Sequence, residues 1–409
     1  MKLQQYRRVL ALPGVRPLIL VALLARIPFT AVGVTLTLHV VLDLHRGYAA
    51  AGLVTAANTI GSALGAPLLG RLVDRRGLRP VLLLTALGAA AFWAVAPFLP
   101  YPWLMVAGLL GGLVALPVFA VVRQSIAALV GPDQRRPAYA LDSMSVELSF
   151  MVGPALAVIA VTQLSARLAM LIVGATTIVA GLGLLVLNPP VRAPEEAQQP
   201  AGRVPRRSWL RGRLVALLVL SGAATVVLSG SDVSIVAVLR AAGQVSWAGI
   251  VFPIWCACSL VGGFVYGALR RPVPAVALVG LMGLLTLPVG LAGGWWALSL
   301  ALLPAGILCA PLLAGTADEV SRLAPGQARG EAMGLQNSAL TTGVAIGAPF
   351  AGAVIDASGP GWGFVAVGLV GVVAAAATLP AWRRTRSTGR AQPPGRQLVT
   401  AAAGQPPTR

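Results

Sequence analysis

The stretch Gly70-Arg71-Leu72-Val73-Asp74-Arg75-Arg76-Gly77-Leu78-Arg79-Pro80 separates two apolar runs, residues 49–69 and 80–99. Each run has about 20 residues, the length that a helix needs to cross the hydrocarbon core of a bilayer. The stretch itself is basic and contains one acid and two glycines. It therefore predicts a short polar turn between two membrane helices.

The same alternation of apolar runs and short polar turns continues along all 409 residues. Ten further apolar runs cover residues 18–42, 102–122, 138–160, 167–187, 214–238, 246–268, 273–292, 295–316, 332–355 and 361–381. Charged residues make up only 11% of the chain, against about 25% in globular proteins. The sequence thus predicts an all-α membrane protein with twelve transmembrane helices, the first of them an uncleaved helix.

The basic residues are distributed unequally between the turns. With the N-terminus inside, 27 of the 31 lysines and arginines fall on the cytoplasmic side. This is the asymmetry of a plasma-membrane protein whose two termini are cytoplasmic. It accounts for the net charge of +19 without a nucleic-acid partner. The single lysine, Lys2, excludes a P-loop and hence an ATP-driven pump.

The longest polar connection, residues 188–213, divides the chain into two sets of six helices. We expect an N-terminal bundle over residues 1–187, a cytoplasmic linker, a C-terminal bundle over 214–381 and a disordered basic cytoplasmic tail over 382–409. The two sets share internal patterns, because Gly52 to Gly70 and Gly249 to Gly267 frame equivalent helices. This similarity predicts two pseudo-symmetric halves with a transport pathway between them.

The quoted stretch resembles the loop 2–3 signature of the major facilitator superfamily (MFS), G-x-L-a-D-R-x-G-R-R/K. The matching positions are Gly70, Leu72, Asp74, Arg75, Gly77 and Arg79, while Leu78 departs from the pattern. The resemblance, which covers essentially the whole chain, implies a secondary transporter that works by alternating access. It also implies a cytoplasmic gate, in which Asp74 pairs with a neighbouring arginine and with the chain near residues 331–337.

A second resemblance concerns the fifth helix. Gly153-Pro154 is similar to the G-P element of export members of the superfamily, although the glycine pair that normally follows is absent. The eleventh helix carries the related pair Gly347 and Pro349. Glycine and proline in membrane helices permit close contacts and bends, so we expect these four residues to serve helix packing.

Two opposite charges are predicted at the same depth in the membrane. Arg26 lies about 12 Å into the first helix and Glu147 about 14 Å into the fifth. A charge at this depth costs at least ~2.5 kcal/mol, so we expect the two side chains to pair. The pair is either a static contact that fixes helix packing or a proton-exchange site in which Arg26 tunes Glu147. Thr30 and Thr37 follow Arg26 on one helix face and are candidates for lining the substrate cavity.

Three further charged residues are assigned by their depth. Asp142 is expected at the hydrated inner mouth, with a structural or gating role. Asp232 is expected near the outer mouth, where it either faces water or contributes to substrate or proton entry. Arg123 is assigned to the cytoplasmic end of the fourth helix, without a role in transport.

The remaining residue types indicate no cofactor, no metal site and no enzyme. The three cysteines lie in apolar runs, the two histidines have no companion ligands, and no nucleophile, base and orienting group occur together. We therefore expect a monomeric, proton-coupled exporter of small apolar or amphipathic compounds such as drugs, antibiotics or metabolites. The alternatives are an importer or uniporter of a sugar, nucleoside or other nutrient, and a membrane receptor or assembly factor that does not transport.

Overall fold

The computed structural model describes residues 2–192, 205–269 and 273–388, and every regular element in these ranges is helical. The elements of the first half are α1 (Lys2–Ala11), α2 (Val15–Leu42), α3 (Tyr48–Arg76), α4 (Leu78–Val95), η1 (Ala96–Phe98), α5 (Tyr101–Leu113), α6 (Val118–Leu129), α7 (Arg135–Gln163) and α8 (Ala166–Leu187). Those that follow are α10 (Arg206–Trp209), α11 (Arg213–Ala241), η2 (Val245–Trp247), α12 (Ala248–Gly267), α13 (Ala275–Thr286), η3 (Leu287–Leu291), α14 (Trp295–Gly306), α15 (Cys309–Leu323), η4 (Gly326–Ala328), α16 (Arg329–Ser358) and α17 (Pro360–Thr388).

The predicted all-α membrane fold is confirmed. Within the described ranges, eleven helical segments are long and apolar enough to cross a membrane, and the shorter apolar segment Ala275–Leu291 occupies the ninth predicted position. Each lies where the sequence predicts a span. Many large apolar side chains on these helices are exposed, as expected of a surface that faces lipid.

The fourth and tenth predicted spans are each built from two helices. The fourth is interrupted between α5 and α6, where Pro117 precedes the second helix, and the tenth is interrupted between α14 and α15. Helix α15 carries Pro311 in its first turn, where the missing N–H does not disrupt helical hydrogen bonding. The breaks occupy equivalent positions in the two halves, which supports the internal repeat.

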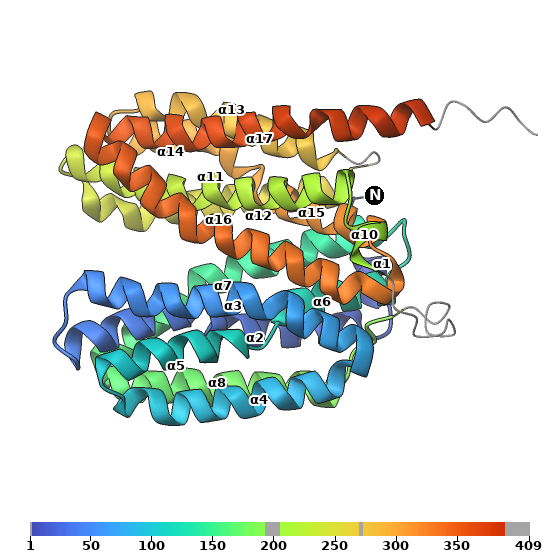
Figure 1. The fold of residues 1–409 in the computed structure, drawn as a ribbon. Coiled ribbons are helices and arrows are strands. Elements are labelled where there is room, and N and C mark those ends of the chain that lie inside the picture. Colours follow the sequence, from blue (N-terminus) through green and yellow to red (C-terminus); the bar gives the residue numbers. More distant parts are fainter. Residues whose placement is uncertain (1, 193–204, 270–272, 389–409) are drawn as a thin grey trace, which may run out of the picture.

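The helices form two groups, α2–α8 in the lower part of Figure 1 and α11–α17 in the upper part. Contacts between the groups are made chiefly by two helix pairs, α3 with α16 and α7 with α12, and α7 also packs on α15. At one end of the molecule, called here the basic end, lie α1, the α3–α4 turn and α10.

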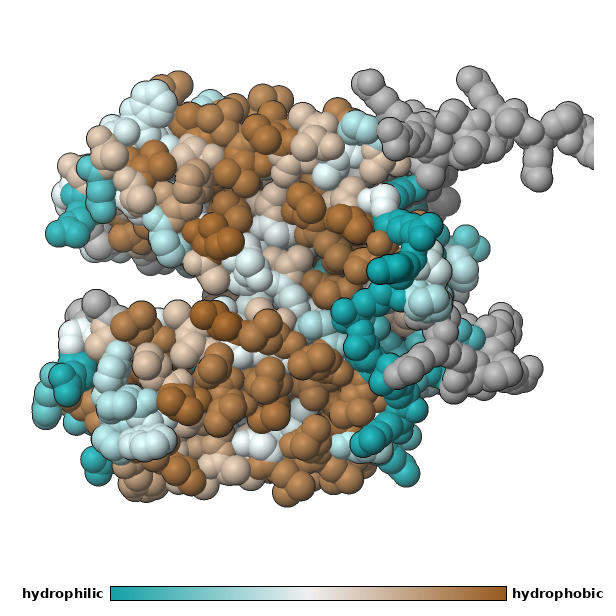
Figure 2. Space-filling view, viewed as in Figure 1, coloured by the Kyte–Doolittle hydropathy of each residue, from teal (hydrophilic) through white to brown (hydrophobic). Residues whose placement is uncertain are grey.

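The two groups separate towards the opposite end, called here the open end. Figure 2 shows a cleft between them, which starts at the open end and ends near the middle of the molecule, while hydrophilic residues cover the basic end. The molecule is therefore in a state in which one end is open and the other shut.

Three details differ from the sequence-based expectations. The motif at residues 70–76 is not a loop but the last two turns of α3, which ends at Gly77, a residue with φ +82°. Helix α17 continues to Thr388, so residues 382–388 of the predicted disordered tail are helical. Residues 389–409 and 193–204, the rest of the tail and the middle of the linker, lie outside the described ranges.

The two halves use the same helix contact. In the first half, Thr30 on α2 donates a hydrogen bond to the carbonyl of Ser149 on α7 at 2.8 Å, and Gly153 lies directly against Thr30 and the carbonyl of Ile27. In the second half, Thr225 on α11 donates to the carbonyl of Leu340 on α16 at 2.8 Å.

Two glycines of α16 then lie against α11. Gly343 lies against Thr225, and Gly347 lies against the backbone of Val226. Pro154 and Pro349 each follow within these helices. The repeated contact between helix pairs supports the expected packing role of Gly153 and Gly347, whereas Pro349 is exposed on α16.

Candidate functional site

The closed basic end depends on a carboxylate that caps a helix of the other half. Asp74, buried in the last turn of α3, accepts hydrogen bonds from the backbone N–H of Gly330 at 2.9 Å and of Glu331 at 2.8 Å. These donors belong to the first turn of α16, where N–H groups have no partner within the helix. A negative charge at this position is also favoured by the helix dipole. Gln124 on α6 donates to the same carboxylate at 3.0 Å.

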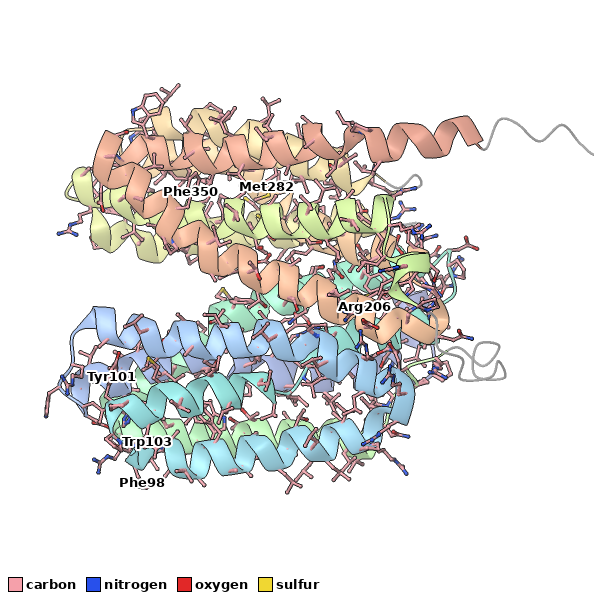
Figure 3. The ribbon with its side chains drawn as sticks, viewed as in Figure 1. Phe98, Tyr101, Trp103, Arg206, Met282 and Phe350 are labelled. Carbon is pink, nitrogen blue, oxygen red and sulfur yellow. The ribbon has the colours of Figure 1, made fainter. Side chains whose placement is uncertain are left out.

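A second acid makes the reciprocal contact from the other half. The Glu331 carboxylate accepts a hydrogen bond from Arg71 on α3 at 2.6 Å and another from Arg206 on α10. Figure 3 places Arg206 at the basic end beside α16. The linker therefore contributes directly to the closed end, which the sequence did not indicate.

The helices α3 and α16 cross here at backbone distance. A Cβ atom at Gly330 would lie 2.6 Å from Asp74 Oδ1 and 2.7 Å from the carbonyl oxygen of Gly70. Only glycine leaves room for this approach. Gly70, Asp74, Gly330 and Glu331 are called the gate contact below.

The structure modifies the expected roles of the other motif residues. Asp74 does not pair with an arginine of the motif; the guanidinium of Arg192 instead donates to the Asp74 main-chain carbonyl. Arg75 and Arg79 are exposed, and the described part of the chain gives them no ion pair. Gly77 lies between α3 and α4 and has the positive φ at which α3 ends. The expected contact with the start of the eleventh helix is present, but it is made through backbone N–H groups.

The other side of the closed end joins α7 and α1 to the C-terminus of α12. Arg136 on α7 donates to the carbonyl of Leu269 at 2.6 Å, just beyond the last turn of α12. Tyr6 on α1 donates to the carbonyl of Phe264 at 2.5 Å, and its ring stacks on the Phe264 ring at 4.9 Å. Burial raises the pKa of Tyr6 to about 12, so the hydroxyl remains a donor. Neither Tyr6 nor α1 was predicted to take part.

A buried ion pair lies between α2 and α7, but its acid is not the one expected. Arg26 pairs with Asp142 at 2.6 Å, with the two side chains 0% and 1% exposed, and it also donates to Ser145 at 2.6 Å. The predicted pair of Arg26 with Glu147 is wrong, and so is the hydrated position of Asp142. Five residues along a helix correspond to a rotation of about 140°, so Glu147 points away from α2 when Asp142 points towards it.

Arg123 belongs to the same cluster. It is buried on α6, with its Nε 3.5 Å from Asp142 Oδ2, and not at a cytoplasmic helix end as expected. The cluster therefore contains two guanidinium groups and one carboxylate. The predicted span ends at residue 122, whereas α6 continues to Leu129, so Arg123 lies in the middle of this helix and not at its end.

Glu147 faces the other half. It is half-buried and hydrogen-bonds to Ser259 on α12. Asp232 on α11 lies within electrostatic range of it. Asp232 is exposed on the wall of the cleft, in a groove of about 860 Å³ that also includes Phe252 and Asp356. Within the described ranges, neither Glu147 nor Asp232 has a basic partner within ion-pair distance.

The threonines of α2 contact neighbouring helices. Thr30 is hydrogen-bonded to α7, while Thr37 lies 3.4 Å from Thr55 on α3 and is partly exposed. The expected polar face of α2 is therefore divided between two helix contacts. Of these two residues, only Thr37 lies on the open half of the helix.

Comparison with known proteins identifies the family. The sequence profile of the Major Facilitator Superfamily matches residues 18–269 and 232–407. The chain belongs to the Major Facilitator Superfamily. It is a transporter and not an enzyme, as the sequence predicted.

Among curated relatives, the tetracycline resistance protein, class C, of Escherichia coli is 30% identical over 142 residues. The match covers 33% of this chain and 36% of that protein, so the chain spans about a third of the length of this relative.

Two solved structures share the fold. The human organic anion transporter MFSD10 (TETRAN) has a TM-score of 0.69 at 20% identity, covering 91% of this chain and 99% of that one. A bacterial homologue of the iron transporter ferroportin in an outward-facing state has a TM-score of 0.71 at 16% identity, covering 92% of this chain and 100% of that one. At such identities the similarity establishes the fold alone.

Proposed function

We propose that this protein exports small apolar or amphipathic compounds in exchange for protons, by alternating access. The observation that carries the proposal is the position of two acids from opposite halves, Asp232 on the wall of the groove and Glu147 within electrostatic range of it, neither with a basic partner in the described ranges. Rocking of the halves would change their separation and their access to water. A carboxyl group at this depth is costly to keep charged, so it is suited to taking up a proton in one state and releasing it in the other.

The buried cluster of Arg26, Arg123 and Asp142 then has a structural role in this proposal. Its ion pair joins α2 to α7 within one half and does not cross the interface between the halves. Of the two interpretations left open by the sequence, a static contact fits Arg26 and a proton site fits Glu147. In this proposal Arg26 stabilises helix packing, and Glu147 carries the proton.

The direction of transport is inferred from three observations. The partial similarity to a tetracycline resistance protein favours export of a drug-like compound. The wall of the groove is mainly apolar, with Phe252, Val233 and Val236 among its residues, and its charged side chains are Asp232, Arg240 and Asp356. This combination suits an apolar or amphipathic substrate better than a sugar. The positive charges at the basic end support a cytoplasmic position for that end and for both termini in a plasma-membrane protein, and in this orientation the cleft opens outward. We propose that the carrier works as a monomer.

Transport by purified protein in sealed vesicles with an imposed pH gradient tests the proposal. Tetracycline and a fluorescent amphipathic dye serve as probes. We expect gradient-driven accumulation by the unsubstituted chain and its loss in Glu147→Gln, because the amide cannot carry a proton. Asp356→Asn removes another acid, one that lines the groove with Asp232, and should retain the response to the gradient.

Each alternative gives a different result in this experiment. Accumulation that ignores both the gradient and Glu147→Gln would refute proton coupling through Glu147. Movement of the probe only down its own concentration gradient would indicate a uniporter, and movement together with protons an importer. Absence of flux for all probes would favour a receptor that does not transport.

A further inference from the structure

A second cavity lies at the basic end, outside the gate contact and the cleft. It has a volume of about 370 Å³ and is bounded by Gln5 and Arg8 of α1, the α6–α7 turn at Asp133 and Gln134, Arg136 of α7, and Leu269 beyond α12. Its walls therefore come from both halves of the molecule. Nothing in the transport proposal uses this space.

The donors around this cavity outnumber the acceptors. The cavity is lined by two guanidinium groups, those of Arg8 and Arg136, by two side-chain amides and by one carboxylate, that of Asp133. The described part of the chain gives no ion pair between Asp133 and either arginine. Arg136 donates a hydrogen bond from Nη1 to the Leu269 carbonyl. The Nε atom of Arg136 is buried and has no hydrogen-bond partner. An unsatisfied buried donor is unfavourable, so an acceptor in the cavity would stabilise this arrangement.

The guanidinium groups that line the cavity are suited to binding a phosphate group. The planar guanidinium presents paired N–H donors that match the oxygens of a phosphate. The cavity lies at the end of the molecule where positive charge is concentrated, and anionic lipids are attracted to such ends of membrane proteins.

We propose that this cavity binds a phosphate group, supplied by an anionic lipid headgroup or by a free phosphate compound. Arg8 and Arg136 bind its oxygens, and Gln5 and Gln134 supply additional donors. The bound group connects α1 and the α6–α7 turn to the end of α12, alongside the hydrogen bond from Tyr6 to Phe264. The site is complete only while the basic end is closed.

Thermal unfolding of the purified full chain in a neutral detergent tests the proposal, with phosphatidylglycerol, phosphatidylcholine or inorganic phosphate added in increasing amounts. We expect phosphatidylglycerol to raise the unfolding midpoint in a saturable manner and phosphatidylcholine to leave it unchanged. A rise with inorganic phosphate as well would show that the phosphate group alone is sufficient. A rise with the lipid alone would identify the headgroup as the source.

Arg8→Gln is the decisive variant, because Arg8 is exposed and has no other contact to lose in the described structure. It should weaken the effect of phosphatidylglycerol by about tenfold, the value of one charge-assisted hydrogen bond. Arg7→Gln removes the same charge from the exposed neighbouring position, which does not line the cavity, and should behave as the unsubstituted chain. The proposal is overturned if neither phosphate source shifts the midpoint, or if Arg8→Gln and Arg7→Gln respond equally.

Discussion

Asp74 shows how a single side chain can close one end of this carrier. Its carboxylate binds two N–H groups at the start of a helix in the other half. The contact therefore combines hydrogen bonding with the attraction between a negative charge and the positive end of a helix. In the proposed alternating-access cycle the two halves rock apart at this end, so this contact has to break and re-form in every cycle.

Replacing Asp74 with Asn should lower turnover more than substrate affinity. The amide keeps one acceptor oxygen but loses the charge, and each charge-assisted hydrogen bond is worth ~1.5–3 kcal/mol. The closed basic end should become less populated, by about tenfold or more, while the cleft residues remain unchanged. Initial transport rates over a range of substrate concentrations measure both quantities. Equal rates for Asp74→Asn and the unsubstituted chain would refute the gating role.

The buried cluster leads to a prediction about stability. Asp142 neutralises two arginines, so Asp142→Asn leaves Arg26 and Arg123 without a counter-charge, whereas Arg26→Gln leaves Asp142 with Arg123. Breaking a buried pair costs ~3–5 kcal/mol, and Asp142→Asn should be the more destabilising of the two. Thermal unfolding midpoints measure the difference.

The control for the cluster is an exposed arginine. Arg167 is 59% exposed, and its ion pair with Asp43 is long, at 4.0 Å. Because exposed ion pairs contribute little, Arg167→Gln should change stability by ~0.5 kcal/mol or less. If Asp142→Asn were no more destabilising than Arg167→Gln, the cluster would have no structural role.

At this scale the sequence predicted which charged residues lie within membrane helices, but not which residues contact each other. Arg26, Glu147, Asp142 and Asp232 were recognisable because charges in membrane helices are rare and costly. Depth alone suggested the pair Arg26–Glu147, but rotation about the helix axis selects Asp142. A check of angular position would have found this partner. The backbone donors of Gly330 and Glu331 left no comparable signal.

Among the secondary-structure elements, the packing of α2 on α7 depends on Gly153. A Cβ at this position would lie 2.6 Å from the carbonyl oxygen of Ile27 and still closer to the Thr30 hydroxyl. Close helix approach at small residues replaces the hydrophobic effect as a source of stability within a membrane. The equivalent contact of α16 with α11 suggests that the helices within each half are held together in the same way.

Gly153→Ala should therefore lower the thermal unfolding midpoint. Gly181 is the matched control, since a Cβ there would meet only the Ala86 side chain at an ordinary 3.8 Å. In a helix interior, Gly→Ala without a clash is favourable by ~0.5–1 kcal/mol, so Gly181→Ala should be neutral or stabilising. A Gly153→Ala protein as stable as Gly181→Ala would contradict the packing role.

The positions of the twelve spans could be predicted from the sequence because apolar runs of about 20 residues are typical of membrane helices and rare elsewhere. The additional elements could not. Helix α1 and the four-residue α10 are too short and too polar to stand out, and their positions depend on contacts with the closed end, such as Tyr6 to Phe264 and Arg206 to Glu331. The breaks before α6 and α15 interrupt runs whose composition is apolar throughout.

The whole molecule consists of two helix groups that meet at one end and separate at the other. The gate contact and the contacts of Arg136 and Tyr6 hold the basic end shut while Asp232 is exposed in the cleft. Since α3 and α16 run continuously from the basic end to the open end, opening one end by rocking should close the other. This reciprocity distinguishes a transporter of this family from a static channel or a receptor with the same fold.

The distance between the two halves at the open end tests this reciprocity most directly. Spin labels at Leu164 and Leu291, which are 57% and 89% exposed, report it in a chain whose three cysteines are replaced by alanine. Gly330→Ala introduces a Cβ that would lie 2.6 Å from Asp74 Oδ1, whereas a Cβ at Gly352 on the same helix meets nothing within 4 Å. We predict that Gly330→Ala shifts the label-to-label distance to shorter values and that Gly352→Ala leaves it unchanged. An identical distance distribution in folded Gly330→Ala and Gly352→Ala proteins would contradict the coupling of the two ends.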